Sequence, residues 1–214
     1  MPGRSYVPAL RFEALSRVYD PLMERWPAAR RMRAAVIAAL DLCPGLRVLE
    51  LGCGPGRLAV AVKRRHPSLV VEALDADPAM IARARELARE SGVDVDFREA
   101  DVARLPTQGP FDRIYSTLVF HHLSPGHKVA ALAEASRVLR TGGLLVIADF
   151  GRPRGALQAA ISTLVYPLDG PRNTLPHLHG EFEAMVRAAF PRTEAAAAWR
   201  TMFGTIELLV CRKD

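Results

Sequence analysis

The sequence predicts an α/β protein, with a doubly wound and mostly parallel seven-stranded sheet that a C-terminal antiparallel hairpin completes. Apolar stretches of strand length alternate with helical patterns between residues 47 and 149, which is typical of a parallel sheet covered on both faces. A glycine-rich turn joins the first of these strands to a helix. Near the end of the chain, two extended apolar segments follow each other with a short turn between them, which indicates the hairpin.

Five strands of the sheet are predicted from short runs rich in Val, Leu, Ile and Phe. They lie at Arg47–Leu51, Val70–Asp75, Val95–Glu99, Phe111–Ser116 and Gly143–Asp149. Segments with the 3.6-residue period of a helix separate them, near Arg57–Arg65, Pro78–Ser91 and Lys128–Leu139. Gly92 and Gly142 each come just after a periodic segment, so we expect both glycines to cap helices.

The pattern changes after Phe150. A helix is predicted over Ala156–Leu168, whose apolar face would consist of Leu157, Ile161, Leu164, Val165 and Leu168. A loop rich in Pro, His and Asn then leads to a short helix from Gly180 to Ala189. The two hairpin strands are predicted at Ala195–Met202 and Thr205–Arg212, with the turn at Phe203 and Gly204.

The first 43 residues also carry a helical pattern. Their apolar stripe consists of Leu15, Val18, Tyr19, Leu22, Met23 and Trp26. Three interpretations stay open: a helix packed on the rest of the domain, a lid over a ligand cleft, and a helix that lies on a membrane surface. We divide the chain into a helical lid, residues 1–43, and a main domain, residues 44–214.

Composition is that of an ordinary globular protein, and 214 residues suit one α/β domain. No apolar run reaches the roughly 18 residues that span a bilayer, and Met1–Leu10 lacks the apolar core of a signal peptide. We therefore expect a cytoplasmic location. Cys43, Cys53 and Cys211 lie far apart in the sequence, so neither a disulfide framework nor a metal site is predicted.

The net charge of +6 comes almost entirely from arginine, since Lys63, Lys128 and Lys213 are the only lysines. The arginines are spread along the chain and form no basic arm with interleaved aromatic residues. We expect no nucleic-acid partner.

The glycine-rich turn reads V-L-E-L-G-C-G-P-G-R-L over Val48–Leu58, with glycines at Gly52, Gly54 and Gly56. In the dinucleotide fingerprint the third glycine comes three residues after the second and allows close packing beside a pyrophosphate. Here that position is Arg57. The spacing favours a ligand without a pyrophosphate.

Polar residues follow the predicted strands in turn, where ligands bind in a doubly wound sheet. Asp75 ends the second strand, Asp101 follows the third, Ser116 ends the fourth and Asp149 ends the fifth. A single acid at such a position is often a helix N-cap. Four polar positions in register with a glycine turn indicate a binding crevice.

With these motifs, the segment Val48–Phe150 resembles the class I S-adenosylmethionine-dependent methyltransferases, which have a Rossmann-like fold. The motifs that carry the resemblance are V-L-E-L-G-C-G-P-G, A-L-D-A-D-P, R-E-A-D-V, V-F-H-H-L and E-A-S-R-V-L-R-T-G-G-L-L-V-I-A-D-F. The last two, with R-V-Y-D near the N-terminus, are most similar to the group that includes the ubiquinone/menaquinone-biosynthesis methyltransferases.

The resemblance implies S-adenosylmethionine as cofactor and a set of residues that bind it. Glu50 would orient the glycine loop and the amino group of the cofactor, and Asp75 would accept the ribose hydroxyls. Asp101 and Val102 would take the adenine. The implied cofactor-binding residues are Tyr19, Glu50, Gly52, Cys53, Gly54, Gly56, Asp75, Ala76, Met80, Asp101, Val102 and Ser116.

His121 is the candidate general base, which is needed only if the acceptor carries a proton. Adjacent residues of a helix do not share a face, so we expect at most one of His121 and His122 to point inward. A largely apolar acceptor pocket is expected between the N-terminal helix and residues 151–180. Its candidate substrate-binding residues are Tyr166, His177 and His179.

The sequence thus predicts an enzyme that transfers a methyl group to a small, largely apolar acceptor by in-line displacement. Two alternatives remain: a phospholipid N-methyltransferase that docks on membranes through its N-terminal helix, and a module that binds S-adenosylmethionine without catalysis. A small-molecule acceptor is the expected partner of a monomer or homodimer, and peripheral membrane contact is compatible with the pattern.

Overall fold

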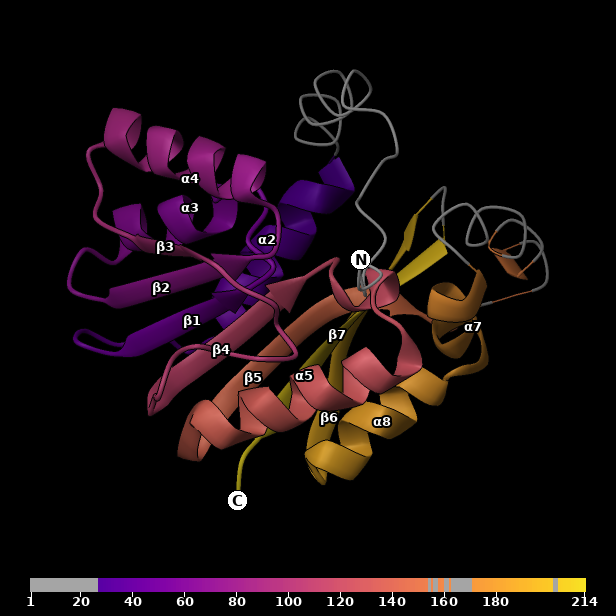
Figure 1. Cartoon of the computed structure of the whole chain (residues 1–214). Helices are drawn as coiled ribbons and strands as arrows, with labels where there is room; N and C mark the ends of the chain where they lie inside the picture. Colours follow the sequence, from indigo (N-terminus) through magenta and orange to yellow (C-terminus); the bar gives the residue numbers. More distant parts are fainter. Residues whose placement is uncertain (1–26, 154, 156–157, 160–161, 163–170, 202–203) are drawn as a thin grey trace, which may run out of the picture.

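The sheet has the strand order β3-β2-β1-β4-β5-β7-β6 (Figure 1). The computed structural model describes residues 27–153, 155, 158–159, 162, 171–201 and 204–214. The strands are β1 Arg47–Leu51, β2 Val70–Asp75, β3 Asp96–Glu99, β4 Phe111–Thr117, β5 Leu139–Gly151, β6 Arg192–Thr201 and β7 Gly204–Arg212. The predicted fold class is confirmed.

Strands β1 to β5 are parallel, and β7 pairs antiparallel with both β5 and β6. From β1 the chain builds outward through β2 to β3, and then returns to place β4 on the other side of β1. The order of the strands therefore reverses between β1 and β4. In open α/β sheets the crevice outside the carboxyl ends of the strands at such a point is where ligands bind.

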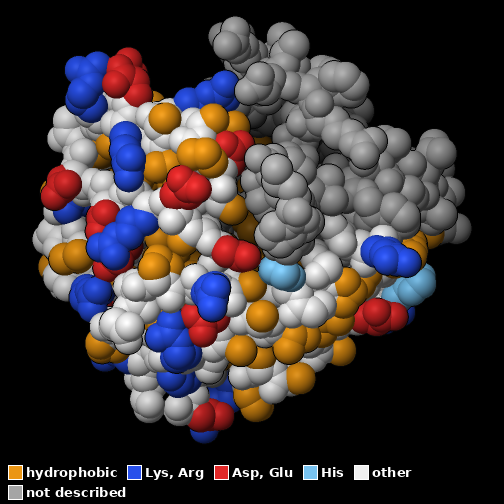
Figure 2. Space-filling model, viewed as in Figure 1, with side chains coloured by type: hydrophobic (Ala, Val, Ile, Leu, Met, Phe, Trp, Pro, Cys, Tyr) orange, Lys and Arg blue, Asp and Glu red, His pale blue; other side chains and the backbone are white. Residues whose placement is uncertain are grey.

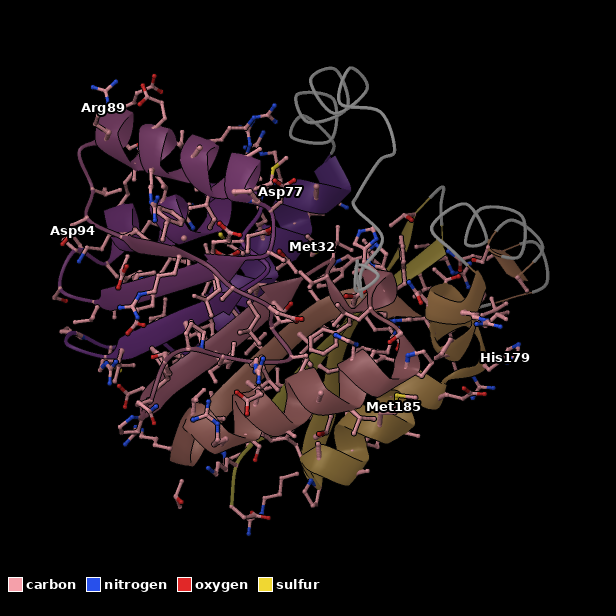
Figure 3. All side chains as sticks on the ribbon, in the orientation of Figure 1. Met32, Asp77, Arg89, Asp94, His179 and Met185 are labelled. Atoms are coloured by element: carbon pink, nitrogen blue, oxygen red, sulfur yellow. The ribbon has the colours of Figure 1, made fainter. Side chains whose placement is uncertain are left out.

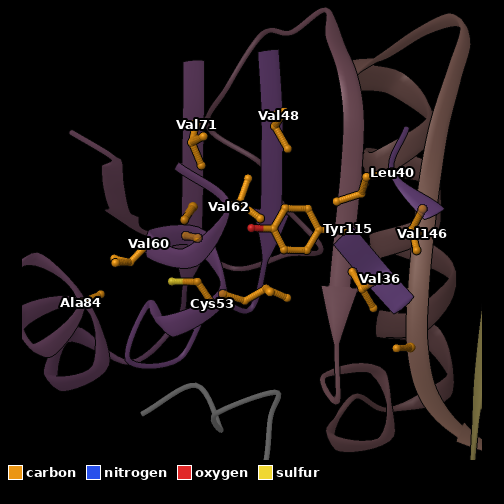
Figure 4. Close-up of a cluster of buried hydrophobic side chains, with 14 of the residues drawn as sticks. Val36, Leu40, Val48, Cys53, Val60, Val62, Val71, Ala84, Tyr115 and Val146 are labelled. Carbon is orange, nitrogen blue, oxygen red and sulfur yellow. The ribbon is translucent and has the colours of Figure 1, made fainter. Parts of the chain in front are cut away.

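Helices cover both faces of the sheet (Figure 1). One face carries α2 Pro27–Ala39, α3 Arg57–Arg65 and α4 Pro78–Ser91, and the other carries α5 Pro125–Val138 and α8 Glu181–Ala189. Because successive residues of a strand point to opposite faces, Val48 packs in the first layer and Leu49 in the second. Figure 4 shows the first layer, in which Tyr115 lies among apolar side chains.

Both boundaries of α5 differ from the predicted helix Lys128–Leu139. The helix begins at Pro125, where the Ser124 hydroxyl caps it by accepting the His127 N–H at 3.4 Å. It ends at Val138, because Leu139 is already extended and pairs with Phe111 of β4. The predicted C-cap at Gly142 is therefore wrong. Gly142 lies inside β5 and its N–H donates to the Lys213 carbonyl at 2.9 Å.

Gly92 has the left-handed conformation of a C-cap, with φ 64°, as predicted for the end of α4. The predicted loop after residue 170 is wrong, since Pro171–His179 forms the helix α7. Tertiary contacts hold this helix: Asn173 donates to the His122 carbonyl at 2.8 Å, and His177 donates to the Phe150 carbonyl at 2.7 Å. Contacts of this kind leave no repeating apolar pattern in the sequence, so the helix could not be predicted from one.

The hairpin forms as predicted, although β6 begins at Arg192, three residues before the expected start at Ala195. The predicted helix Ala156–Leu168 falls mostly outside the described residues. Of the predicted helical region 1–43, the structure describes α2. Residues 1–26, including Tyr19, lie outside the described part, so the lid interpretation stays a prediction.

Gly56 begins α3 in the left-handed conformation, with φ 75°, and a Cβ there would lie 2.8 Å from the Phe97 ring. Gly56→Ala is expected to lower the free energy of unfolding by about 3 kcal/mol, since the conformation costs about 1–2 kcal/mol and overpacking adds about 1–3 kcal/mol. Urea unfolding measures this loss. Gly45→Ala is the control, because φ is 82° with no atom within 4 Å. Equal losses in both variants would contradict the packing contribution.

Candidate active site

The glycine loop lies at the carboxyl end of β1, and its three glycines each have a positive φ, between 51° and 75°. The Cys53 N–H donates to the Leu74 carbonyl of β2 at 2.8 Å, which fixes the loop to the neighbouring strand. A Cβ on Gly52 would lie 2.3 Å from Val119 Cγ2, whereas a Cβ on Gly54 would meet nothing within 4 Å. The loop therefore closes on the β4 side and leaves a bare main-chain surface at Gly54.

Asp75 stands beside this surface at the end of β2. Its Oδ2 accepts the Gly54 N–H at 2.7 Å, and its Oδ1 accepts the Asp77 N–H at 2.9 Å. Burial raises the pKa of this carboxyl, while the two backbone bonds oppose the rise. A pyrophosphate would need the Gly54 N–H, which Asp75 already occupies. The remaining lone pairs of the carboxylate suit a vicinal diol.

Glu50 lies under the glycine loop and is 1% exposed. Its Oε2 accepts the Tyr115 hydroxyl at 3.0 Å, and burial raises the pKa of the carboxyl to about 8. Burial and the nearby carboxylates also raise the pKa of the Cys53 thiol. Cys53 is thus a packed part of the loop and no thiolate nucleophile.

The other predicted cofactor residues gather at the same edge. Asp101 Oδ1 accepts the Ala103 N–H at 2.9 Å, and its Oδ2 lies 3.5 Å from His127 Nε2. The buried Ser116 donates to the Leu51 carbonyl at 3.0 Å and so joins the ends of β4 and β1. Val102 is buried, and Ala76 and Met80 are partly buried around the start of α4.

Asp149, at the end of β5 and 1% exposed, accepts four hydrogen bonds. Oδ2 accepts the Val119 and Phe120 N–H groups at 3.0 and 2.7 Å. Oδ1 lies 2.7 Å from the Phe150 nitrogen and 2.8 Å from His121 Nδ1. Although burial alone would raise the pKa of Asp149, His121 and the other partners hold it below its usual range. The carboxylate is charged, so His121 Nδ1 carries a proton and Nε2 is left as a base.

Both histidines of the 3-10 helix η1, Phe120–His122, take part in this cluster. Their ring centroids are 3.9 Å apart, and His122 Nδ1 is buried with no partner among the described residues. The prediction that at most one of the two points inward is wrong, because His121 is buried and the His122 ring contacts it with a buried Nδ1. Burial lowers the pKa of His122 to about 3.

His177 reaches the cluster from α7. It is 1% exposed, stacks on Phe182 with ring centroids 4.3 Å apart, and burial lowers its pKa to about 4. Its Nε2 is buried without a described partner, and His177 lines a small hollow together with Asp149 and Glu207. His179 lies apart, half exposed at the outer end of α7 (Figure 3) and 3.9 Å from Glu181. Tyr166 lies outside the described residues.

Lys128 also belongs to this cluster and was not predicted from the sequence. Lys128 is fully buried on α5 and donates to the carbonyls of Leu123 and Asn173. Nothing in the helical pattern distinguishes Lys128 from other residues of α5. Its importance becomes visible only in the structure, because charged side chains are rarely fully buried.

Within the described ranges, no group of three or more His, Cys, Asp or Glu side chains is placed to hold a metal ion. None of the described helices is both long and apolar enough to cross a bilayer. On the face shown in Figure 2, basic and acidic side chains intermingle over the α3 and α4 side of the molecule, and apolar side chains gather toward α5 and α8.

Known proteins are similar to this chain in sequence and in fold. The profile of the family described as "Methyltransferase domain" matches residues 48–143. A demethylmenaquinone methyltransferase of Thermus thermophilus is 35% identical over 207 residues, which cover 92% of this chain and 88% of that protein. A ubiquinone/menaquinone biosynthesis C-methyltransferase of Bordetella parapertussis is 34% identical over 66% of this chain and 55% of its own.

The chain belongs to the class I S-adenosylmethionine-dependent methyltransferases.

The crystal structure of the YcgJ protein from Bacillus subtilis has the same fold, with a TM-score of 0.71 and 19% identity over 86% of this chain and 99% of that one. The methyltransferase is an enzyme, and S-adenosylmethionine is its methyl donor. Its residues fit that molecule. A bare glycine surface at Gly54 adjoins the free lone pairs of the Asp75 carboxylate, which suits a ribose diol better than a phosphate.

Asp149→Asn is expected to lower the free energy of unfolding by about 3 kcal/mol at neutral pH, because the amide replaces a charged acceptor that four donors surround. The folded pKa of Asp149 lies below the unfolded value of about 3.9. Its contribution is therefore complete above that value and is lost as the pH falls toward the folded pKa.

Urea unfolding at pH 7 and at pH 3 measures the difference between Asp149→Asn and the wild type, which should shrink at the lower pH. Glu86→Gln is the control, since Glu86 pairs with Arg89 on the exposed surface of α4 and should change little at either pH. A difference for Asp149→Asn that is independent of pH would contradict the assignment of a charged carboxylate.

Proposed function

We propose that this methyltransferase acts on a small, largely apolar aromatic acceptor that carries a hydroxyl group, of the reduced naphthoquinone class. The observation that carries the proposal is the buried His121–Asp149 pair, 2.8 Å apart, beside the glycine loop. Such a pair is needed where the acceptor must lose a proton. The demethylmenaquinone methyltransferase that covers 92% of the chain supports the acceptor class.

We assign donor binding to the residues at the ends of β1 to β4. Asp75 accepts the ribose hydroxyls, Asp101 and Val102 contact the adenine, and the backbone from Gly52 to Gly56 packs against the methionyl part. Glu50 supports the loop from below, where Tyr115 holds it. Tyr19 is the further candidate of this set.

The bound donor supplies a methyl group already activated on a sulfonium centre. The protein's own task is to line up the acceptor for in-line attack and to exclude water. His121 Nε2 takes the proton of the acceptor hydroxyl, and the negative charge left on the acceptor makes its oxygen or its ring carbon a stronger nucleophile. Asp149 stabilises the imidazolium that results, because its carboxylate already accepts the Nδ1 proton.

A second alternative is a module that binds S-adenosylmethionine without catalysis, in which the residues of the acceptor side would no longer be needed. Asp75, Asp101 and Asp149 each keep a bonded, oriented carboxylate, which supports an active enzyme. An acceptor screen distinguishes the phospholipid N-methyltransferase alternative. Phenols, quinols, amines and phospholipids are each incubated with radiolabelled donor, and label found in the phospholipid would support this alternative.

Asp75→Ala is expected to weaken binding of S-adenosylmethionine and S-adenosylhomocysteine by about 1–3 kcal/mol, through the loss of charged hydrogen bonds to the ribose. Titration calorimetry measures both affinities. Asp94→Ala is the control, because Asp94 is exposed beyond the far end of α4, whereas Asp77 marks the end near the site (Figure 3). No heat with either ligand in the wild type would refute donor binding itself.

His121→Asn is expected to lower kcat by about 10²–10⁴-fold with a reduced naphthoquinone as acceptor, because it removes the general base. The donor dissociation constant should stay within twofold of the wild-type value. The wild-type rate should rise with pH, as expected for a reaction that needs a general base, and this rise should vanish in the variant. His66→Asn serves as control, since His66 caps the end of α3 that leads into β2, at the opposite ends of the strands from the site. Equal rates in both variants would rule out His121 as the base.

A further inference from the structure

Lys128 is a charged side chain at the centre of the acceptor side of the site, and the mechanism above does not use it. It is 0% exposed. Its ammonium donates to the Leu123 carbonyl, at the end of the β4 loop, and to the Asn173 carbonyl of α7 at 2.7 Å. One buried cation therefore joins three elements: α5, the loop that carries His121, and α7.

A second bond closes the same connection. Asn173 donates from its side chain to the His122 carbonyl at 2.8 Å while its own carbonyl accepts from Lys128. The segment from His122 to Leu123 is thus held to α7 by one amide and one ammonium. Since His121 belongs to the same single turn, its position depends on these bonds as well as on Asp149.

The charge of Lys128 lies among titratable groups from every element packed against it in the described part of the chain. They are Asp149 of β5, His121 and His122 of η1, and His177 of α7. Burial lowers the pKa of Lys128 to about 8, and Asp149 opposes this. The lysine in turn lowers the pKa of both His122 and His177.

Desolvation of an ammonium is unfavourable, and apolar side chains usually fill such a position better. A methionine of similar length would fill it without a charge. A buried cation beside three imidazoles and one carboxylate therefore indicates a role that depends on the charge.

We propose that Lys128 is a positioning residue for methyl transfer: its ammonium holds α7 against the loop of His121, and so keeps His121 in place to take the acceptor proton. This inference rests on the proposed function of His121. The parts of it that concern geometry and charge do not need an acceptor to be tested.

The first test is nuclear magnetic resonance of the full chain without substrate. The three lysines of the chain make the Lys128 signal resolvable by selective labelling, and Lys128→Met assigns it. The midpoint of Lys128 is expected near pH 8 in the wild type. A midpoint near the ordinary lysine value would place the ammonium in water and overturn the proposal.

The second test follows the imidazoles of His122 and His177 in wild type, Lys128→Met and Lys128→Gln. Without the cation, their titration midpoints should rise by about 1 pH unit. Lys63→Met is the matched control, because Lys63 also donates to a main-chain carbonyl, that of Leu69 at 2.5 Å, in the last turn of α3 and away from the site. Lys128→Gln keeps a donor without the charge, so it covers the case in which the methionine variant does not fold.

The third test is kcat with a reduced naphthoquinone. In Lys128→Met, kcat should fall about tenfold while donor affinity stays within twofold, because the loop of His121 loses its bond to α7. Unmoved imidazole midpoints, or a kcat in Lys128→Met that equals that of Lys63→Met, would overturn the proposal. An inactive wild type with the expected midpoints would instead count against the function proposed for His121.

Discussion

The carboxylate of Asp149 is the constraint on which the acceptor side of the site depends. It ends β5, yet its oxygens hold the backbone of Val119 and Phe120 and the ring of His121, all from the chain that follows β4. One buried charge thereby sets the path of a loop and the tautomer of the base within it. Val119, fixed by Asp149, packs on Gly52, so the carboxylate also determines how closely the acceptor loop approaches the donor loop.

The electrostatics of this region follow from burial more than from ion pairing. Asp149 stays charged because four N–H groups converge on it, and Lys128 is the one cation of the described cluster that bonds to carbonyls only. Burial holds His122 and His177 in their neutral form. In surroundings of low dielectric, a buried charge without a partner is unfavourable. Of the three imidazoles in this cluster, His121 is the one whose ring bonds to the Asp149 carboxylate.

The sequence allowed the sheet and the donor loop to be predicted because both leave local signals. Runs such as Arg47–Leu51 are short and apolar, and the glycines near Gly54 require a positive φ that few other residues adopt. The start of α5 was missed although Ser124 and Pro125 form a local start signal, whereas α7 was missed because tertiary bonds at Asn173 and His177 hold it. The pairing of His121 with Asp149 joins residues 28 positions apart, and only the fold brings them together.

The contact between Val119 and Gly52 has a thermodynamic consequence. It joins the loop that would meet the acceptor to the loop that would hold the donor, since Val119 leaves no room for a side chain on Gly52. Any ligand that shifts one loop must do work on the other, so the two binding equilibria are linked. Linkage is reciprocal: the factor by which the donor changes acceptor affinity equals the factor by which the acceptor changes donor affinity. The size of this factor then depends on the stiffness of a single van der Waals contact.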